Sequence, residues 1–266
     1  MQSTRIFEGK HVLITGAARG IGYDISSRFA REGAILSLLD FNKESLDNAV
    51  IELRRITTTV YPYYTDVSNR QMVDGAVSEA EKIQPVDVLI NNAGIALETP
   101  FLHIEQEEWK RIIDINLTGI FHVAQSVCRY MAVRKKGIVI NMASKNGIDG
   151  EFGYAHYNAS KAGVIMLTKT MALELAHLGI RVNAVCPGYI QTPMSKEIDP
   201  PAFVENFVKQ FIPMNRVGTV DDVSPIFLFL AGEGSSFMTG QIIIADGGQL
   251  AGQKPGDDLL SKFSSK

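Results

Sequence analysis

Short runs of apolar residues recur from one end of the chain to the other, and longer stretches of mixed apolar and polar residues separate them. Most of the short runs are unbroken series of Val, Ile and Leu, which is the pattern of strands buried on both faces of a sheet. We predict seven strands, at Val12–Thr15, Ile35–Leu39, Val60–Thr65, Val86–Asn91, Ile138–Met142, Arg181–Val185 and Ile242–Ala245.

The longer stretches predict helices at Gly22–Glu32, Lys43–Thr57, Arg70–Ile83, Glu107–Arg134, Tyr157–Leu178, Pro201–Gln210 and Val220–Ala231. Regular alternation of strands and helices predicts an α/β fold, with one doubly wound parallel sheet of seven strands and helices on both faces. No internal repeat or linker divides the chain. We therefore expect a single domain over residues 1–252 and a polar tail over residues 253–266.

Composition narrows the class of protein. The 266 residues include 45% apolar and 21% charged residues, enough for a sizeable core. The net charge of -3, with no long basic block, argues against a nucleic-acid partner. The chain has no signal-peptide core and no run of membrane-spanning length. Cys128 and Cys186 match neither a disulfide framework nor a metal-ligand spacing, so we expect a cytoplasmic protein with no metal and no membrane partner.

A glycine-rich turn follows the first predicted strand. Gly16, Gly20 and Gly22 let the backbone turn tightly and approach a pyrophosphate, while the next helix presents its N-terminal N–H groups, at residues such as Ile21. The spacing G-x-x-x-G-x-G departs from the dinucleotide fingerprint G-x-G-x-x-G. Taken alone, the segment is also compatible with an ordinary turn from strand to helix.

Two residues bear on the choice of dinucleotide. Asp40 follows the second predicted strand, where a carboxylate accepts hydrogen bonds from ribose hydroxyls and repels a 2′-phosphate. Arg19, inside the glycine turn, points the other way because a guanidinium pairs with phosphate. We predict NAD, with NADP as the lesser alternative, and note that Asp40 is also compatible with a helix cap or turn residue.

Three chemically active side chains converge on the carboxyl edge of the predicted sheet. Tyr157 and Lys161 are four residues apart on one helix face, and Ser144 follows a predicted strand. A neighbouring ammonium and a positive nicotinamide would favour the phenolate form of Tyr157. Tyr157 can then exchange the proton of an alcohol, while Ser144 hydrogen-bonds the substrate oxygen and Lys161 holds the nicotinamide ribose.

These motifs occur together in one order: Thr15–Gly22 (TGAARGIG), Asn91–Gly94 (NNAG), Asn116, Ser144, Tyr157–Lys161 (YNASK) and Pro187–Gly188. Together they resemble the short-chain dehydrogenase/reductase family over residues ~8 to 250, and several separated motifs are far more specific than one. The resemblance implies a Rossmann-type domain with Ser144, Tyr157 and Lys161 as catalytic residues. It adds Asn116 as a fourth member that holds a water for proton relay.

The same resemblance implies further cofactor contacts, at Asp66, Val67, Asn92, Ala93, Gly94, Pro187, Gly188, Ile190 and Thr192. Without it, Asp66 is equally compatible with a helix cap through Ser68, and residues 92–94 with a simple turn.

The loop after Ser144 is polar and rich in glycine. Lys145, Asn146, Glu151 and His156 offer hydrogen bonds to hydroxyl groups and a charge partner for an anion, so we predict a sugar, polyol or sugar acid bound with Ser144 and Tyr157. These groups are also compatible with simple solvent exposure. Residues 190–217 resemble the variable lid of the family and do not name a substrate.

The leading hypothesis is an NAD-dependent oxidoreductase that interconverts a secondary alcohol and a ketone on a small polar substrate. The alternative is an NADPH-dependent 3-oxoacyl-thioester reductase. A regulatory protein that has lost the chemistry would carry damage at the catalytic positions, and none is damaged. The resemblance also implies a homotetramer built through the helices predicted at Glu107–Arg134 and Tyr157–Leu178, with Ile242–Ala245 near a second interface.

Overall fold

The computed structural model describes residues 5–256, so residues 1–4 of the expected domain and residues 257–266 of the predicted tail lie outside the described residues. One seven-stranded sheet runs through the molecule in the order β3-β2-β1-β4-β5-β6-β7, and all pairings are parallel. Its strands are β1 His11–Thr15, β2 Ile35–Asp40, β3 Val60–Tyr64, β4 Val88–Asn91, β5 Gly137–Met142, β6 Ile180–Pro187 and β7 Ile242–Ala245. The predicted fold class is confirmed.

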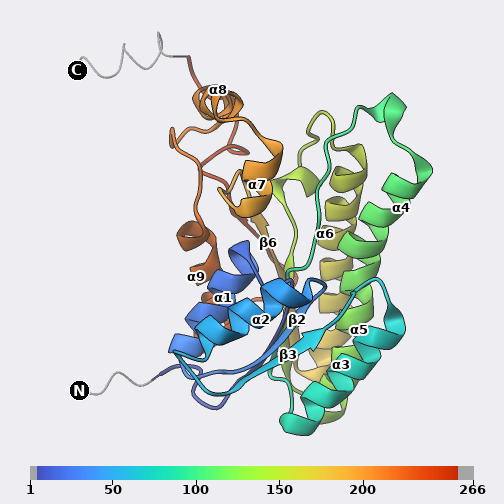
Figure 1. Ribbon diagram of the computed structural model, residues 1–266. Coiled ribbons are helices and arrows are strands. Elements are labelled where there is room, and N and C mark those ends of the chain that lie inside the picture. The colour runs from blue at the N-terminus through green and yellow to red at the C-terminus, as the bar shows by residue number, and fades with distance from the viewer. Residues whose placement is uncertain (1–4, 257–266) are drawn as a thin grey trace, which may run out of the picture.

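Helices cover both faces of this sheet (Figure 1). One face carries α1 Gly20–Arg31, α2 Lys43–Leu53 and α9 Val220–Ala231, and the other carries α3 Arg70–Ile83, α5 Gly119–Arg134 and α6 Ala155–Leu175. Phe29 of α1 and Phe227 of α9 are fully buried in the same cluster as Ile14 of β1. Burying each such side chain contributes about 1.5–3 kcal/mol, which is why the continuous apolar runs end up inside.

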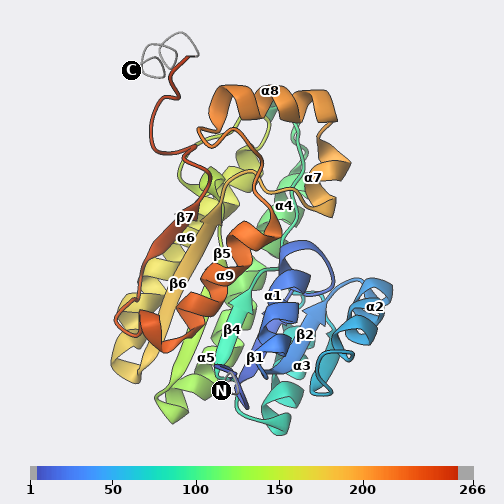
Figure 2. The ribbon, with the colours of Figure 1, turned by 90° about the vertical axis from the view of Figure 1, so that its left-hand side faces the viewer.

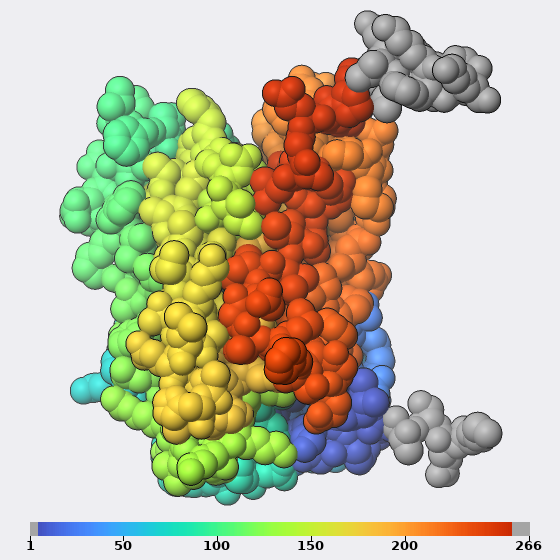
Figure 3. Space-filling view, turned by 180° about the vertical axis from the view of Figure 1, so that it is seen from behind, coloured from blue at the N-terminus to red at the C-terminus, as the bar shows by residue number. Residues whose placement is uncertain are grey.

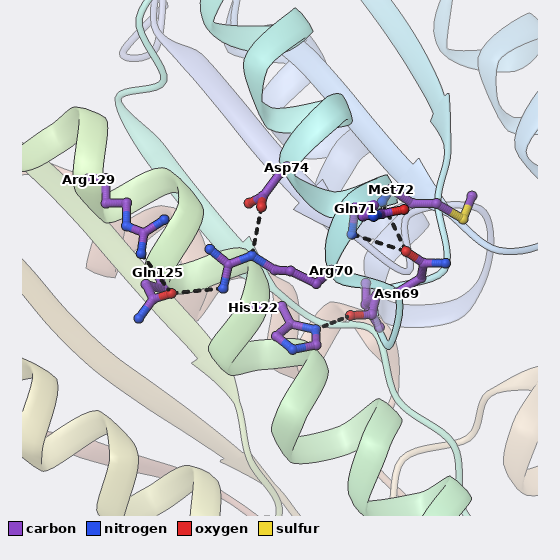
Figure 4. Close-up of polar contacts among 9 residues, drawn as sticks. Asn69, Arg70, Gln71, Met72, Asp74, His122, Gln125 and Arg129 are labelled. Atoms are coloured by element: carbon purple, nitrogen blue, oxygen red, sulfur yellow. Dashed lines mark hydrogen bonds and ion pairs between the residues drawn. The ribbon is translucent and has the colours of Figure 1, made fainter.

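Polar side chains set where several helices begin. Asn42 Oδ1 accepts a hydrogen bond from Ser45 N at 2.8 Å at the start of α2. Asn69 does the same for Gln71 N and Met72 N at the start of α3 (Figure 4). These oxygens satisfy N–H groups that have no partner within the helix, so the sequence fixes these helix starts locally.

The long helix predicted at Glu107–Arg134 is interrupted. It consists of α4 Gln106–Ile113, a π-helical segment Asp114–Thr118 and then α5. A π turn has more residues than an α turn, so it rotates the side chains that follow it. Asn116 lies within this segment and is fully buried.

Smaller differences concern helix ends. Helix α6 begins at Ala155, two residues before the predicted start, and its last turn, Ala176–Leu178, is a 3-10 helix. Helix α2 ends at Leu53 rather than Thr57, because Ile56 and the threonines after it are β-branched and form helix poorly. The chain also forms 3-10 turns at Phe101–His103, Lys145–Gly147 and Glu233–Ser235.

Two helices lie above the carboxyl ends of the strands, α7 Pro193–Ile198 and α8 Pro201–Phe211 (Figure 2). Helix α7 was not predicted from the sequence. It begins at a capping box between Thr192 and Ser195 with Pro193 in its first turn. These helices roof the edge where β1 and β4 are neighbours and the chain winds away in opposite directions, which is the usual ligand position in open α/β sheets. Within residues 5–256, no helix has the length and apolar character that crossing a membrane requires.

Candidate active site

A cleft of about 1580 Å³ opens at this carboxyl edge, between the strand ends and the roof formed by α7 and α8. Every residue that the sequence assigned to cofactor binding lines it, from Gly16 in the turn after β1 to Thr192 before α7. Ser144, Tyr157 and Lys161 line the same cleft. The fold therefore brings the predicted cofactor and catalytic residues into one space.

The glycine turn between β1 and α1 fits a pyrophosphate. Gly16 has φ +62°, and a Cβ on it would lie 2.8 Å from Ala93 Cα. A Cβ on Gly22 would lie 2.1 Å from the Gly16 carbonyl oxygen, so only glycine allows this close approach. Arg19, at the N-cap of α1, gives no side-chain cap, which leaves the N–H groups of the first turn facing the cleft without a capping side chain.

Asp40, at the end of β2, also organises this turn. Its Oδ2 accepts a hydrogen bond from Ala18 N and its Oδ1 accepts one from Asn42 N, both at 2.9 Å. Each carboxylate oxygen can accept more than one hydrogen bond, so Asp40 can bind ribose hydroxyls while it holds the turn. Arg19 points toward the roof, where its guanidinium lies 3.5 Å from Glu197 on α7.

The segment between β3 and α3 lines the cleft and contacts α5. Asp66 Oδ1 accepts hydrogen bonds from the Ser68 backbone and hydroxyl, as the cap interpretation predicts, and Asp66 still lines the cleft. The His122 ring donates from Nδ1 to the Val67 carbonyl oxygen at 3.2 Å. Next to it, Arg70 joins Gln125 of α5 to Asp74 of α3 (Figure 4). This network fixes the backbone under the predicted adenine site.

Tyr157 lies at the centre of the predicted catalytic group. An interaction with the Ser144 side chain lowers the pKa of its hydroxyl, and the Lys161 ammonium lies 5.6 Å from the centre of its ring. Lys161 Nζ also donates to the Met142 carbonyl oxygen at 2.9 Å, which fixes the long side chain at the end of β5. The helix spacing of Tyr157 and Lys161 therefore does place both groups on one face of α6, as the sequence predicts.

Burial dominates the acid–base behaviour of this group. Burial raises the pKa of Tyr157 to about 12, although the hydrogen bond from Ser144 lowers it. Burial lowers the pKa of Lys161 to about 8. The sequence predicted that the lysine depresses the tyrosine pKa, but in the protein alone desolvation of the phenolate raises it.

Asn116, the predicted fourth catalytic residue, is outside the lining of the cleft. Its Oδ1 accepts from Ile95 N at 2.9 Å, and its Nδ2 donates to Ile95 O at 2.8 Å and to Ser160 Oγ at 3.2 Å. A Cβ on the neighbouring Gly94 would lie 3.3 Å from Asn116 Oδ1 and 3.6 Å from Lys161 Nζ. Asn116 thus holds the loop beside the lysine, and its part in a proton relay stays a prediction.

The polar loop after Ser144 faces the cleft as predicted. Lys145 Nζ lies 2.8 Å from Glu151 Oε2, and the lysine side chain is 8% exposed. Asn146 Nδ2 donates to Asn158 Oδ1 at 3.0 Å. These contacts preorganise one polar wall next to the catalytic residues.

The position of His156 differs from the prediction that this residue contacts the substrate. Its side chain is fully buried and does not line the cleft. The ring instead bonds Glu108 of α4 through Nε2 and the Tyr157 backbone N–H through Nδ1. On a helix packed on several sides, a polar residue can face a neighbouring helix rather than the ligand.

Several lining residues were not predicted from the sequence. Phe207 of α8 packs on Tyr189 with ring centres 5.4 Å apart, and both line the cleft. Phe207 belongs to a series of phenylalanines on α8 that is visible in the sequence but equally fits simple core packing, and Tyr189 lies after β6. Gln249 comes from the segment after β7, and its Oε1 is buried without a hydrogen-bond partner. No local signal marks Gln249, because only the fold brings it to the cleft.

Fold and site together define an oxidoreductase of the nucleotide-dependent, doubly wound class. The family model described as "Enoyl-(Acyl carrier protein) reductase" matches residues 16–249. With this match and the relatives below, the chain belongs to the short-chain dehydrogenase/reductase family, whose members act on alcohol or ketone groups with NAD(P).

The relatives cover almost the whole chain. It is 43% identical to the 3-oxoacyl-[acyl-carrier-protein] reductase FabG of Thermotoga maritima over 91% of this chain and 98% of the relative. It is 37% identical to the 5-keto-D-gluconate 5-reductase of Escherichia coli over 91% and 96% of the two chains. A gluconate 5-dehydrogenase from Burkholderia cenocepacia, in complex with NADP and tartrate, superposes with a TM-score of 0.88 at 33% identity, covering 94% and 98%.

Proposed function

We propose that the protein oxidises a secondary alcohol, or reduces the matching ketone, on a small polyhydroxy substrate, with NAD as its cofactor. This proposal rests on one observation: Ser144, Tyr157 and Lys161 line the same cleft as the glycine turn and Asp40. The glycine turn would hold the pyrophosphate, Asp40 the adenosine ribose, and Lys161 the nicotinamide ribose. When bound, the oxidised nicotinamide is the hydride acceptor and adds positive charge beside Tyr157.

The chain's own residues handle the proton. The Ser144 hydroxyl donates a hydrogen bond to the substrate oxygen and holds it beside the Tyr157 hydroxyl. The Tyr157 phenolate takes the hydroxyl proton as the carbinol carbon loses its hydride, and the C–O single bond becomes a carbonyl. In the reverse direction Tyr157 returns that proton to the oxygen. Because burial raises the pKa of Tyr157, the phenolate depends on nearby positive charge.

The preference for NAD rests on Asp40 and Arg19. Asp40 places a carboxylate at the predicted ribose site, and the Arg19 guanidinium that would suit a 2′-phosphate lies against Glu197. We expect Asp40→Asn to lower the ratio of kcat/KM for NAD to that for NADP by at least about tenfold, because like charges brought together cost several kcal/mol. Steady-state kinetics with both cofactors measure this ratio.

Asp47→Asn, which removes a surface carboxylate of α2 that pairs with Lys43, is the matched control and leaves the ratio unchanged. A wild-type protein that prefers NADP, or an Asp40→Asn ratio equal to that of the wild type, would contradict the assignment of NAD.

The polyhydroxy substrate is supported by the polar wall. The Lys145–Glu151 pair, next to Ser144, presents donors and acceptors that suit several hydroxyl groups or a carboxylate. A screen of nicotinamide absorbance over polyols, aldoses, sugar acids and 3-oxoacyl thioesters, with NAD(H) and NADP(H), tests the proposal. Turnover of a polyhydroxy compound with NAD supports it, whereas turnover confined to NADPH and thioesters would refute it.

A homo-oligomer, a tetramer by family resemblance, is part of the same proposal. Apolar side chains stand exposed on α5 and α6, among them Val133 at 86% and Leu173 at 83%. From behind, α6 and the last described segments of the chain lie side by side on one face (Figure 3). Strand β7 is an edge of the sheet, and its Ile244 is 45% exposed. Exposed apolar patches of this kind mark protein interfaces.

We expect light scattering to give a mass of about four chains. Leu173→Glu should shift this mass to a smaller species, because a charge in an apolar interface is costly. Ile51→Glu, on the opposite face of the sheet, is the control and leaves the mass unchanged. A wild-type mass equal to one chain would overturn the proposal.

The buried, unpaired state of both cysteines supports the further proposal that the protein works in the reducing cytoplasm.

A further inference from the structure

The helix that carries Tyr157 and Lys161 begins without a usual cap. Tyr154 occupies the N-cap position of α6 and offers no side-chain hydrogen bond. The first N–H groups of a helix have no partner within it, and a buried one that is left unpaired is costly. Tyr157 is the third residue of α6, so its own N–H is one of these groups.

His156 supplies the missing partner from inside the helix. Tyr157 N donates to His156 Nδ1 at 2.9 Å, so Nδ1 carries no proton. The proton of the neutral ring therefore lies on Nε2, which donates to Glu108 Oε1 at 2.7 Å. Both ring nitrogens of a fully buried side chain are satisfied, and one tautomer is selected.

Glu108 is fixed in turn. It lies in the first turn of α4, where a carboxylate is favoured by the helix dipole. A hydrogen bond from Thr99 and, to a lesser extent, the contact with His156 hold the pKa of Glu108 below its ordinary value. Glu108 therefore accepts the hydrogen bond from His156 as an ionised carboxylate. Helix α4 leads directly into the π-helical segment that contains Asn116.

We propose that His156 and Glu108 are positioning residues for the reaction, which orient the first turn of α6, and so the Tyr157 hydroxyl, toward Ser144. The two hydrogen bonds Glu108–His156 and His156–Tyr157 connect α4 to α6. His156 and Glu108 act through Tyr157 and do not contact the substrate. This inference rests on the proposed role of Tyr157. It replaces the substrate contact that the sequence assigned to His156.

Variants at position 156 separate the two hydrogen bonds. His156→Leu fills the space without either bond, while His156→Asn places an amide oxygen where Nδ1 was and restores the acceptor for Tyr157 N. We expect His156→Leu to lower kcat roughly 10- to 100-fold, since small misplacement of a reacting group is costly. NAD affinity should stay within about twofold in the same protein, and His156→Asn should recover at least about a third of the wild-type kcat.

The partner of the ring gives an independent pair of variants. Glu108→Gln keeps an oxygen that accepts from Nε2, whereas Glu108→Ala removes it, so kcat should fall further in the alanine variant. Glu105→Gln, an exposed residue just before α4, is the control. If His156→Leu does not fold, the Glu108 pair decides the question.

A readout without substrate keeps this inference distinct from the proposed reaction. Nitrogen NMR of the wild-type protein should show His156 with its proton on Nε2, and hydrogen exchange of the Tyr157 amide should speed up in His156→Leu. A kcat within twofold of the wild type in His156→Leu, a proton on Nδ1, or no difference between His156→Asn and His156→Leu would overturn the inference. A Tyr157→Phe protein that stays fully active would instead overturn the proposed reaction.

Discussion

Replacing Tyr157 by phenylalanine is expected to lower kcat by about 10²- to 10⁴-fold, the usual contribution of a positioned acid–base group. The Tyr157 side chain is partly buried and lines the cleft, so phenylalanine keeps the contacts of the ring and removes only the hydroxyl beside Ser144. Binding of NAD should stay within about twofold, because the hydroxyl acts on the substrate proton. Steady-state kinetics and a fluorescence titration of NADH measure the two effects.

Tyr154 provides the matched control. Its ring centre is 6.1 Å from that of Tyr157, it lines the same cleft, and burial likewise raises its pKa. Tyr154→Phe should retain most of the activity, because no hydrogen bond joins Tyr154 to Ser144 among the contacts of the described residues. Equal losses of activity in the two variants would mean that removing either tyrosine hydroxyl from the cleft impairs the enzyme. The acid–base role would then not be specific to Tyr157.

The second large effect is expected at Lys161, where activity and stability should move in opposite directions. Lys161→Met should lower kcat by about 10²- to 10⁴-fold through loss of the ammonium beside Tyr157. At pH 7 it should also raise the free energy of unfolding by up to about 2 kcal/mol. Burying the charged lysine costs the wild type stability, and the lost hydrogen bond to Met142 offsets part of that gain.

The difference in the free energy of unfolding between Lys161→Met and the wild type should depend on pH. Burial lowers the pKa of Lys161 to about 8 in the folded protein, from 10.5 in the unfolded chain. Below pH 8 the lysine is charged in both states and the wild type bears the full burial cost. Between pH 8 and 10.5 only the unfolded chain holds the proton, so the wild type gains stability as pH rises. The advantage of Lys161→Met should therefore shrink across this window.

Urea unfolding of both proteins at pH 7 and pH 10 measures the change. Lys169→Met, at an exposed position on the same helix, is the control and should change neither activity nor the pH dependence. A Lys161→Met protein that is less stable than the wild type at pH 7 would contradict the prediction. It would show that the interactions of the charged lysine in the folded protein outweigh the cost of burying it.

Some features of the site were predictable because they are encoded by neighbouring residues. The glycines of the first turn, Asp40 after β2 and the Tyr157–Lys161 spacing each lie within one strand, turn or helix. The continuous apolar runs fixed the seven strands, since only burial on both faces accommodates them. Parallel strands then bring all their carboxyl ends to one edge, so the convergence of these motifs followed from the fold class.

Other features depend on contacts between residues far apart in the sequence. The π-helical segment at Asp114–Thr118 buries Asn116 against Ile95 and Ser160, and no periodicity in the predicted helix marks it. Helix α6 is packed on several sides, so its sequence pattern does not say which neighbour His156 faces. Its partner Glu108 lies 48 residues earlier in the chain.

The sequence by itself therefore determined the fold class, the family and the edge of the sheet at which the predicted reacting groups lie, because hydrophobic periodicity and short motifs act locally. Only the tertiary structure decided how those groups are held: Asp40 binds the glycine turn, Arg19 lies against Glu197, and His156 bonds the Tyr157 N–H and Glu108 rather than lining the cleft. The physical reason is that the direction of a polar side chain is set by whichever partner satisfies its hydrogen bonds once the helices have packed.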